Sequence, residues 1–388
     1  MQIHPAQTKR KVGIDLGPAS RLQQAPGTAV HVSGQLTALF KLDVPWEWVP
    51  VAESDKNPLL DQVAQWNPSI TPGRSYWRRA VFSVGSEWQR RGCDLGFATA
   101  FFVPWTGIPV MTNFFDAGMF TEEYARSWST SGKGWNFKLI KALGIHALWR
   151  SEILFTDSEY WRDFLHQRFP SYADKIIVTP CGVELPRETP MPRPPWSALL
   201  HRPFFLFAGA FSDNKNQFRL IELWARLQAL HADLPALVLL GPCSDSYRQA
   251  CIDPALRKLP RPNDVFLPGL VSDDELAWAF QNAMAYLQPS FMEGFGMPII
   301  EAMSYGLPVA CSDSTSLPGT AGGAAILFTP DQLDSIGESV MALWQDASLR
   351  EDLRQRGLAR ASEFTWGKNA VIVASNIELI LRKNSILH

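Results

Sequence analysis

The sequence predicts an α/β protein made of two doubly wound domains, each a mostly parallel sheet with crossover helices. Three observations predict this fold. The chain has 388 residues, more than one hydrophobic core usually organises. Strand-like apolar runs, each followed by a glycine-containing loop and a helix-like stretch, recur in both halves. Between the halves, residues 185–203 are rich in proline and lack hydrophobic periodicity, which is typical of a stiff linker.

The first half opens with the strand, loop and helix that begin such a domain. We predict a strand over 11–16, a loop through Gly17 and Gly27, and a helix over 31–42 with apolar residues at helical spacing. Further strands are predicted at 97–103, 110–115, 153–156 and 176–179, with a helix over 135–149. We expect the first domain to span 1–186.

The second half shows the same alternation more regularly. After the predicted linker, 187–203, strands are expected at 204–207, 236–241, 265–268, 284–287 and 308–311. Helices are expected over 217–230 and 274–283, the latter with Ser272 as N-cap, and the chain turns helical after Asp331. We expect this domain to span 204–370 and a C-terminal helix, 371–388, to pack back on the first domain. In such sheets ligands bind at the carboxyl ends of the strands.

Composition narrows the class of protein. A formal net charge of −2 argues against a general nucleic-acid binder, which would carry a strongly basic face. Five cysteines without a C-x-x-C pair indicate reduced thiols and a cytoplasmic protein. No apolar stretch reaches the length of a membrane span, and the N-terminus lacks the apolar core of a secretory signal.

Tryptophan is abundant, with fifteen residues in the chain. Two clusters combine aromatic residues with arginine, at 76–79 (Tyr-Trp-Arg-Arg) and at 88–91 (Trp-Gln-Arg-Arg). Such a mixture suits peripheral contact with the inner face of a membrane. Core aromatics beside solvated arginines are the alternative interpretation.

The most informative segment runs from 288 to 309, where an apolar run leads through a glycine-containing loop into a helix-like stretch. Gly294 and Gly296 lack a Cβ and allow close approach of a ligand to the backbone. Pro298 suits the first position of a helix, where its missing N–H costs nothing, and the N-terminal amides of a helix bind anions. Glu293 and Glu301 bracket the loop, and Glu301 could accept hydrogen bonds from a ribose diol. Two solvated glutamates at an ordinary loop–helix junction are the alternative.

Residues 293–309, EGFGMPIIEAMSYGLPV, resemble the E-x7-E signature of the family-4 retaining glycosyltransferases. These enzymes have the GT-B fold, in which two Rossmann-like domains face a cleft. The resemblance implies that Glu293 lies close to the transferred sugar and that Glu301 holds the ribose. It also implies that the loop contacts the donor through Gly294, Phe295, Gly296 and Met297.

Two further segments of the second half resemble the same family. In 205–224, Lys215 stands at the position of a lysine that clamps the donor diphosphate. Ala210 stands where many members carry a second, cationic residue, and Arg219 is a candidate to replace it. In 265–291, the resemblance implies that the backbone near Leu270 and Val271 holds the nucleotide base, with ordinary core packing as the alternative.

In the first half the resemblance is weaker. Gly27 is at the position of a glycine loop that approaches the donor phosphates, although Pro-Gly is also a common turn. Asp116 matches the aspartate of a His-Asp pair, but Phe115 occupies the histidine position, and Asn113 is a candidate polar neighbour. A helix cap is the competing role for Asp116 and also for Ser158.

The resemblance implies retaining transfer of a hexose from a nucleotide-diphosphate sugar, with GDP-mannose or UDP-hexoses favoured, to a glycan or lipid-linked acceptor in bacterial polysaccharide biosynthesis. Catalysis would involve Glu293, Lys215 and Asp116. No D-x-D pair or His-x-x-x-His pair occurs, so we expect neither a metal ion nor a cofactor besides the donor substrate. The alternative is a catalytically impaired nucleotide-binding paralogue with a docking role, suggested by Ala210 and Phe115.

Overall fold

The computed structural model describes residues 9–21, 26–73, 75–122, 134–184, 186 and 189–386. The chain forms two compact units, one of Met1–Gly182 with Thr365–His388 and one of Val183–Phe364. The predicted linker, 187–203, therefore belongs to the second unit, where the Gln281 side chain bonds Thr189 and Met191. The chain returns from the second unit to the first after Phe364, whereas the predicted second domain ended at 370.

Unit 1 contains a parallel sheet of seven strands in the order β3-β2-β1-β4-β5-β6-β7. The strands are β1 (Arg10–Asp15), β2 (Trp46–Ala52), β3 (Ser69–Ile70), β4 (Leu95–Ala98), β5 (Val110–Asn113), β6 (Ile153–Thr156) and β7 (Ile176–Val178). The helices are α1 (Pro26–Leu39), α2 (Leu60–Val63), α3 (Tyr76–Arg79), α4 (Gly85–Arg90), α6 (Gly134–Arg150), α7 (Glu159–Arg168) and α16 (Trp366–Ile386).

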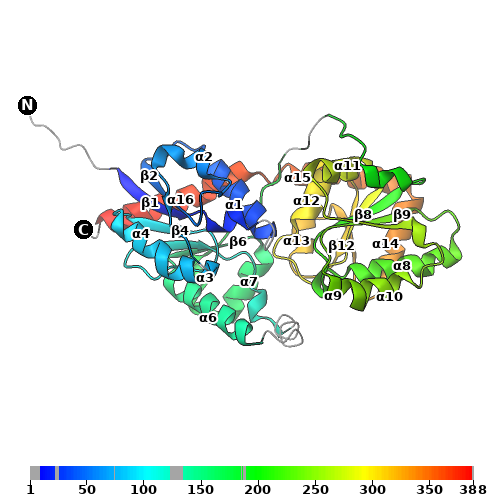
Figure 1. The fold of residues 1–388 in the computed structure, drawn as a ribbon, viewed down its shortest axis with the longest axis horizontal. Helices are drawn as coiled ribbons and strands as arrows, with labels where there is room; N and C mark the ends of the chain where they lie inside the picture. The colour runs from blue at the N-terminus through cyan, green and yellow to red at the C-terminus, as the bar shows by residue number, and fades with distance from the viewer. Residues whose placement is uncertain are drawn as a thin grey trace, which may run out of the picture. The chain divides into compact units, whose positions relative to one another are not determined.

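One face of this sheet is covered by α1 and by the C-terminal helix α16, which lie side by side (Figure 1). Val12 of β1, Leu36 of α1 and Val373 of α16 belong to one buried apolar core. The indole of Trp366 fills the space left by two glycines, because a Cβ on Gly34 would lie 2.2 Å from its ring. A Cβ on Gly182 would likewise meet its backbone nitrogen at 2.2 Å.

The aromatic and arginine clusters of the first half are partly buried rather than surface groups. Trp88 is fully buried in the space that Gly13 of β1 and Gly96 of β4 leave open on the opposite face of the sheet. Arg79 is also buried and pairs with Asp15. These residues therefore contribute to the core, and a membrane contact through Trp88 or Arg79 is excluded.

Unit 2 contains a parallel sheet of six strands in the order β10-β9-β8-β11-β12-β13. The strands are β8 (Phe204–Ala208), β9 (Ala236–Leu240), β10 (Val265–Gly269), β11 (Ala285–Gln288), β12 (Val309–Ser312) and β13 (Ala325–Phe328). The helices are α8 (Gln217–Leu230), α9 (Asp245–Tyr247), α10 (Asp253–Leu256), α11 (Asp273–Asn282), α12 (Met297–Ser304), α13 (Leu317–Ala321), α14 (Leu333–Gln345) and α15 (Ala347–Ala361).

The two faces of this second sheet carry different helices, as Figure 1 shows. Phe205 and Leu237 point into a core that α8 and α14 complete. Phe204, on the other face, stacks on Trp278 of α11. The predicted cap of α11 is confirmed, since Ser272 and Glu275 form a reciprocal capping box.

Candidate active site

The carboxyl ends of β8 and β11 lie next to each other in the middle of the second sheet, where the strand order changes direction. Strands β9 and β10 extend to one side of β8, and β12 and β13 extend beyond β11. At such a switch point the loops diverge and leave room for a ligand. The loop after β8 carries Lys215, and the loop after β11 carries Glu293.

These two side chains form an ion pair. The Lys215 Nζ lies 2.6 Å from both carboxylate oxygens of Glu293. The Glu293 Oε1 also accepts hydrogen bonds of 2.7 Å from Gln288 Nε2 and from Ser290 Oγ, both of which are buried. Lys215 retains 26% exposure and Glu293 10%, so the cation is the more accessible partner.

The loop that carries Glu293 is held in one conformation by backbone contacts. The Glu293 backbone nitrogen donates to Thr315 Oγ1 at 3.1 Å, and the Glu293 carbonyl accepts from Ser316 Oγ at 3.0 Å. Thr315 itself has a φ of 49°, an uncommon left-handed conformation for a threonine. Thr315 is a site residue that sequence reasoning missed, because nothing local marks it.

Gly296 ends this loop as the N-cap of α12 with a φ of 93°. A Cβ at this position would lie 2.4 Å from Leu317 Cδ2, so both conformation and space require glycine. Pro298 is the second residue of α12, one position later than predicted but still in the first turn, where a proline is tolerated. The side chain of Phe295 is buried against Phe364, which leaves only its backbone for a ligand.

Glu301 lies one turn into α12 and is partly buried. Burial of the carboxyl group, together with the negative charges of Asp273 and Glu184, raises the pKa of Glu301 to about 7. A carboxyl group with this pKa holds its proton in slightly acidic solution. It would become a full hydrogen-bond acceptor near neutral pH.

Glycines follow the other strands at this edge of the sheet. A Cβ on Gly241, after β9, would meet the carbonyl oxygen of Gly209, after β8, at 2.1 Å. Gly269 ends β10 with a φ of 85°, and Leu270 beyond it is 79% exposed. Core packing of Leu270 is therefore excluded, and Val271 beside it is partly exposed. An open apolar residue at a strand end suits contact with a planar base.

Arg219, the candidate replacement for the missing cation at Ala210, is engaged elsewhere. Its Nη1 lies 3.1 Å from Glu222 Oε2 on the same helix, and its guanidinium lies over the Phe218 ring. Ala210 is exposed at the end of β8. Lys215 is therefore the cation that the loop after β8 offers.

In unit 1 the expected site residues have different surroundings. Gly27 lies in the first turn of α1, which begins five residues before the predicted helix, and the space beside its Cα is open. Asp116 is exposed, and its Oδ1 accepts a 3.0 Å bond from Gly118 N in a local turn. Ser158 caps α7 by accepting from Trp161 N, as expected of a helix cap.

Asn113 is buried and bonded within the core, so it is not a surface group. Its Nδ2 donates to Gln35 Oε1 at 2.7 Å, and Gln35 in turn donates to Asn369 of α16 at 2.9 Å. Asn369 donates to the carbonyl of Pro180 at 2.8 Å. This chain of buried amides ties α1 and α16 to the carboxyl end of β5.

A second buried polar group lies beside Phe115. The His31 ring is 4.5 Å from the Phe115 ring, and its Nδ1 lies 3.1 Å from Cys181 Sγ and 3.7 Å from Asp157 Oδ1. Burial lowers the pKa of His31 to about 3, and burial raises the pKa of Asp157 well above its usual value. Among the described residues, these three have a geometry that suits a metal ion, and the His31 Nε2 is buried without a hydrogen-bond partner.

The loop after β1 is shaped by the buried pair of Asp15 and Arg79. The Arg79 Nη1 lies 2.9 Å from Asp15 Oδ1, and its other nitrogens donate to the carbonyls of Thr71 and Val51. The same Asp15 oxygen accepts from Gly17 N at 3.0 Å. A Cβ on Gly17 would lie 2.6 Å from the guanidinium, so this glycine is needed for close packing.

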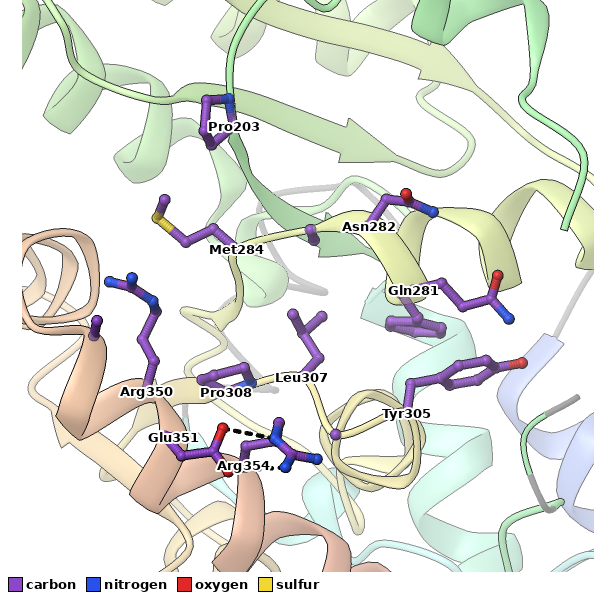
Figure 2. A pocket seen from close by; sticks show the side chains of 14 residues that line it. Pro203, Gln281, Asn282, Met284, Tyr305, Leu307, Pro308, Arg350, Glu351 and Arg354 are labelled. Atoms are coloured by element: carbon purple, nitrogen blue, oxygen red, sulfur yellow. Dashed lines mark hydrogen bonds and ion pairs between the residues drawn. The ribbon is translucent and has the colours of Figure 1, made fainter. Parts of the chain in front are cut away.

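A groove of about 510 Å³ lies at the amino ends of the strands of the second sheet, opposite the carboxyl ends that carry Lys215 and Glu293 (Figure 2). Pro203, Met284 and Pro308, which directly precede β8, β11 and β12, belong to its lining. The arginines that point toward it are already bonded: Arg354 pairs with Glu351, and Arg350 donates to the carbonyl of Leu343. The groove is separate from the carboxyl edge that carries Lys215 and Glu293.

Comparison with known proteins relates the second unit to glycosyltransferases. Residues 194–360 match the family model described as glycosyl transferases group 1. The O-antigen chain mannosyltransferase B of Escherichia coli is 30% identical over 221 residues, covering 56% of this chain and 58% of that protein. The chain thus matches a little over half of this relative's length.

Solved structures share the whole fold at low identity. Sucrose-phosphate synthase from Thermosynechococcus elongatus superimposes with a TM-score of 0.71 at 15% identity, covering 97% of this chain and 100% of that one. WaaG, a glycosyltransferase involved in lipopolysaccharide biosynthesis, superimposes with a TM-score of 0.66 at 14% identity, covering 94% and 99%. The two-unit α/β architecture is the GT-B fold, as predicted.

Proposed function

We propose that this protein is a glycosyltransferase that moves a hexose from a nucleotide-diphosphate sugar to a glycan or lipid-linked acceptor, with retention of anomeric configuration. The observation that carries the proposal is the Lys215–Glu293 pair at the switch point of the second sheet, beside the N-terminus of α12. Both residues lie in the segment that matches the glycosyl transferases group 1 model. The name of the E. coli relative favours mannose as the sugar and bacterial polysaccharide as the product.

The leaving diphosphate gains negative charge as the bond to the sugar breaks. Lys215 is positioned to neutralise that charge, since its ammonium is the more exposed member of the pair. The first backbone amides of α12 have no carbonyl partner within the helix and favour an anion at the same place. Fixed donors of this kind, aimed at developing charge, supply the electrostatic part of catalysis without a metal ion.

The two glutamates would have different tasks. Glu293 is held by Lys215, Gln288 and Ser290, so its carboxylate is oriented before any substrate arrives. We assign it to the transferred sugar. Glu301 has the raised pKa and lies deeper along α12, and we assign it to the ribose hydroxyls. The departing phosphate oxygen then accepts the proton of the acceptor hydroxyl.

The test is sugar transfer by the purified protein from GDP-mannose, UDP-glucose and UDP-galactose, with and without EDTA. Transfer from one donor, unchanged by EDTA and lost in Lys215→Ala, would support the activity, the metal-independent mechanism and the role of Lys215. The anomeric configuration of the product, determined by NMR, tests retention. Transfer that EDTA abolishes would refute the metal-independent mechanism. Lys258→Ala, which removes an exposed lysine of the same unit, is the matched control.

The second candidate is a paralogue that binds nucleotide but transfers no sugar. Ala210 and Phe115 favour this candidate, because each stands where the family-4 glycosyltransferases commonly carry a polar group. Arg219 is paired with Glu222, so it does not replace the cation missing at Ala210. Thermal stabilisation of the protein by a nucleotide, without sugar transfer to any glycan or lipid-linked acceptor tested, would support this candidate. Multiple turnovers with a single donor would exclude it.

A further inference from the structure

Four large apolar side chains of unit 1 gather at the surface along α6. Phe82 is 56% exposed, Trp105 65%, Ile145 46% and Trp149 66%. The rings are contiguous, since the Phe82 ring lies 6.2 Å from that of Trp105, and His146 lies about 6 Å from both tryptophans. We call Phe82, Trp105, Ile145 and Trp149 the α6 aromatic face.

The backbone holds the α6 aromatic face exposed. Trp105 N donates to the Val81 carbonyl at 2.8 Å, which fixes the loop before β5 against the π-helix of 80–84. Arg150 Nη2 donates to the carbonyls of Thr106 and Ile108 at 2.6 Å each, which ties the same loop to the end of α6. These bonds keep Trp105 in place without burying its indole.

The charges along α6 are all positive. The helix carries Lys138, Lys141 and Arg150, and its sequence, Gly134–Arg150, contains no aspartate or glutamate. Lys138, Lys141, Ile145 and Trp149 follow each other at intervals of three and four residues, so they share one side of the helix. Lys138 is exposed and Lys141 partly so, which places two ammonium groups beside the apolar side chains.

We propose that the α6 aromatic face binds the surface of a bilayer rich in anionic phospholipid. Indoles bury their apolar part among acyl chains and keep their polar edge at the headgroups, while lysines reach anionic headgroups. A protein partner fits less well, because lysine is depleted from protein interfaces whereas both lysines flank this surface. Within the described parts of the chain, no helix is both long and apolar enough to cross a bilayer, so binding would be to the surface.

The test is flotation of the full chain with vesicles of phosphatidylcholine alone and of phosphatidylcholine with 30% phosphatidylglycerol. We expect binding to the anionic vesicles and its weakening at high salt. Lys138→Gln with Lys141→Gln should lower the partition coefficient about 30-fold, because each lysine near an anionic surface contributes about fivefold. Trp105→Ser with Trp149→Ser should lower it at least about tenfold.

Matched controls alter groups of the same kind elsewhere in unit 1. Leu379→Ser replaces an apolar residue of α16 that is 61% exposed, and Lys41→Gln removes an exposed lysine. Equal binding of all variants, or no binding of the wild type to anionic vesicles, would overturn the proposal. Vesicle binding does not depend on sugar transfer, so an inactive protein that still floats would contradict only the proposed function.

Discussion

Replacing Glu301 with glutamine should make the protein more stable near neutral pH. Burial, with the nearby charges of Asp273 and Glu184, raises the pKa of Glu301 from 4.5 to about 7, so the carboxyl binds its proton more tightly in the folded protein than in the unfolded chain. Its contribution to stability is therefore fully present below about pH 4.5 and falls as the pH rises to about 7. Since one pKa unit corresponds to about 1.4 kcal/mol, the loss is about 3 kcal/mol.

Nucleotide binding should show the opposite dependence on pH if Glu301 accepts hydrogen bonds from ribose. With a pKa of about 7, only about a tenth of the carboxyl groups are ionised at pH 6 and about nine tenths at pH 8. The apparent Kd is divided by the competent fraction, so affinity should rise about tenfold over this range. Glu301→Gln should bind more weakly than the wild type at pH 8 and lose this dependence.

Two assays on the wild type and Glu301→Gln test whether Glu301 has a raised pKa and binds the ribose. Thermal unfolding at pH 5, 6, 7 and 8 measures the stability term, and calorimetry with the intact nucleotide sugar measures affinity. The intact donor is needed because the terminal phosphate of a free nucleoside diphosphate titrates near the same pH. Asp273→Asn removes a charge that raises the pKa of Glu301, so it should shift both profiles to lower pH. Identical pH profiles for wild type and Glu301→Gln would refute the assignment.

Three further predictions concern other contacts. Lys215→Ala should slow sugar transfer about 100- to 1,000-fold, measured with saturating donor, but change stability little because Gln288 and Ser290 still bond Glu293. Arg79→Leu should cost about 3–5 kcal/mol in chemical denaturation, because it leaves the Asp15 carboxylate buried and unpaired. Gly241→Ala should cost at least about 2 kcal/mol in the same assay, since its φ is 132° and its Cβ would meet a carbonyl oxygen.

Each of these has a matched control. Arg90→Leu breaks an exposed pair with Glu87 and should leave stability nearly unchanged. Gly319→Ala adds a Cβ where no heavy atom lies within 4 Å, so it should be neutral or stabilising. If Arg79→Leu proved as mild as Arg90→Leu, the Asp15 pair would not organise the loop after β1. A Gly241→Ala protein as stable as Gly319→Ala would contradict the close approach of β8 and β9.

Local patterns in the sequence predicted most strands and the main helices of both units, but strands β2, β3 and β13 were missed. Strand β3 has only two residues, too few for a pattern of alternating side chains. Strand β2 contains Pro50, which normally argues against an interior strand. The structure tolerates it because the two-residue strand β3 pairs only with Val51 and Ala52, so Pro50 has no neighbour on that side. Strand β13 is short, lies at the sheet edge and exposes Leu327, which weakens its apolar signal.

The candidate site was predictable where its residues are close in sequence. A glycine N-cap, a proline in the first turn and a glutamate one turn later are local features, and Gly296, Pro298 and Glu301 occupy the expected positions on α12. Contacts across the sheet were not predictable. The ion pair of Lys215 and Glu293 joins residues 78 positions apart, and Thr315 reaches the same loop from beyond β12.

By itself the sequence determined the alternation of strands and helices, the two-domain α/β class and the loop that opens α12, because backbone preferences act over a few neighbouring residues. Tertiary structure decided where Trp88, Arg79 and Asn113 lie, and all three proved to be core residues. It also decided which tryptophans stay exposed on α6. These outcomes depend on the strand order, which brings distant glycines, carboxylates and rings together, and no local pattern encodes those contacts.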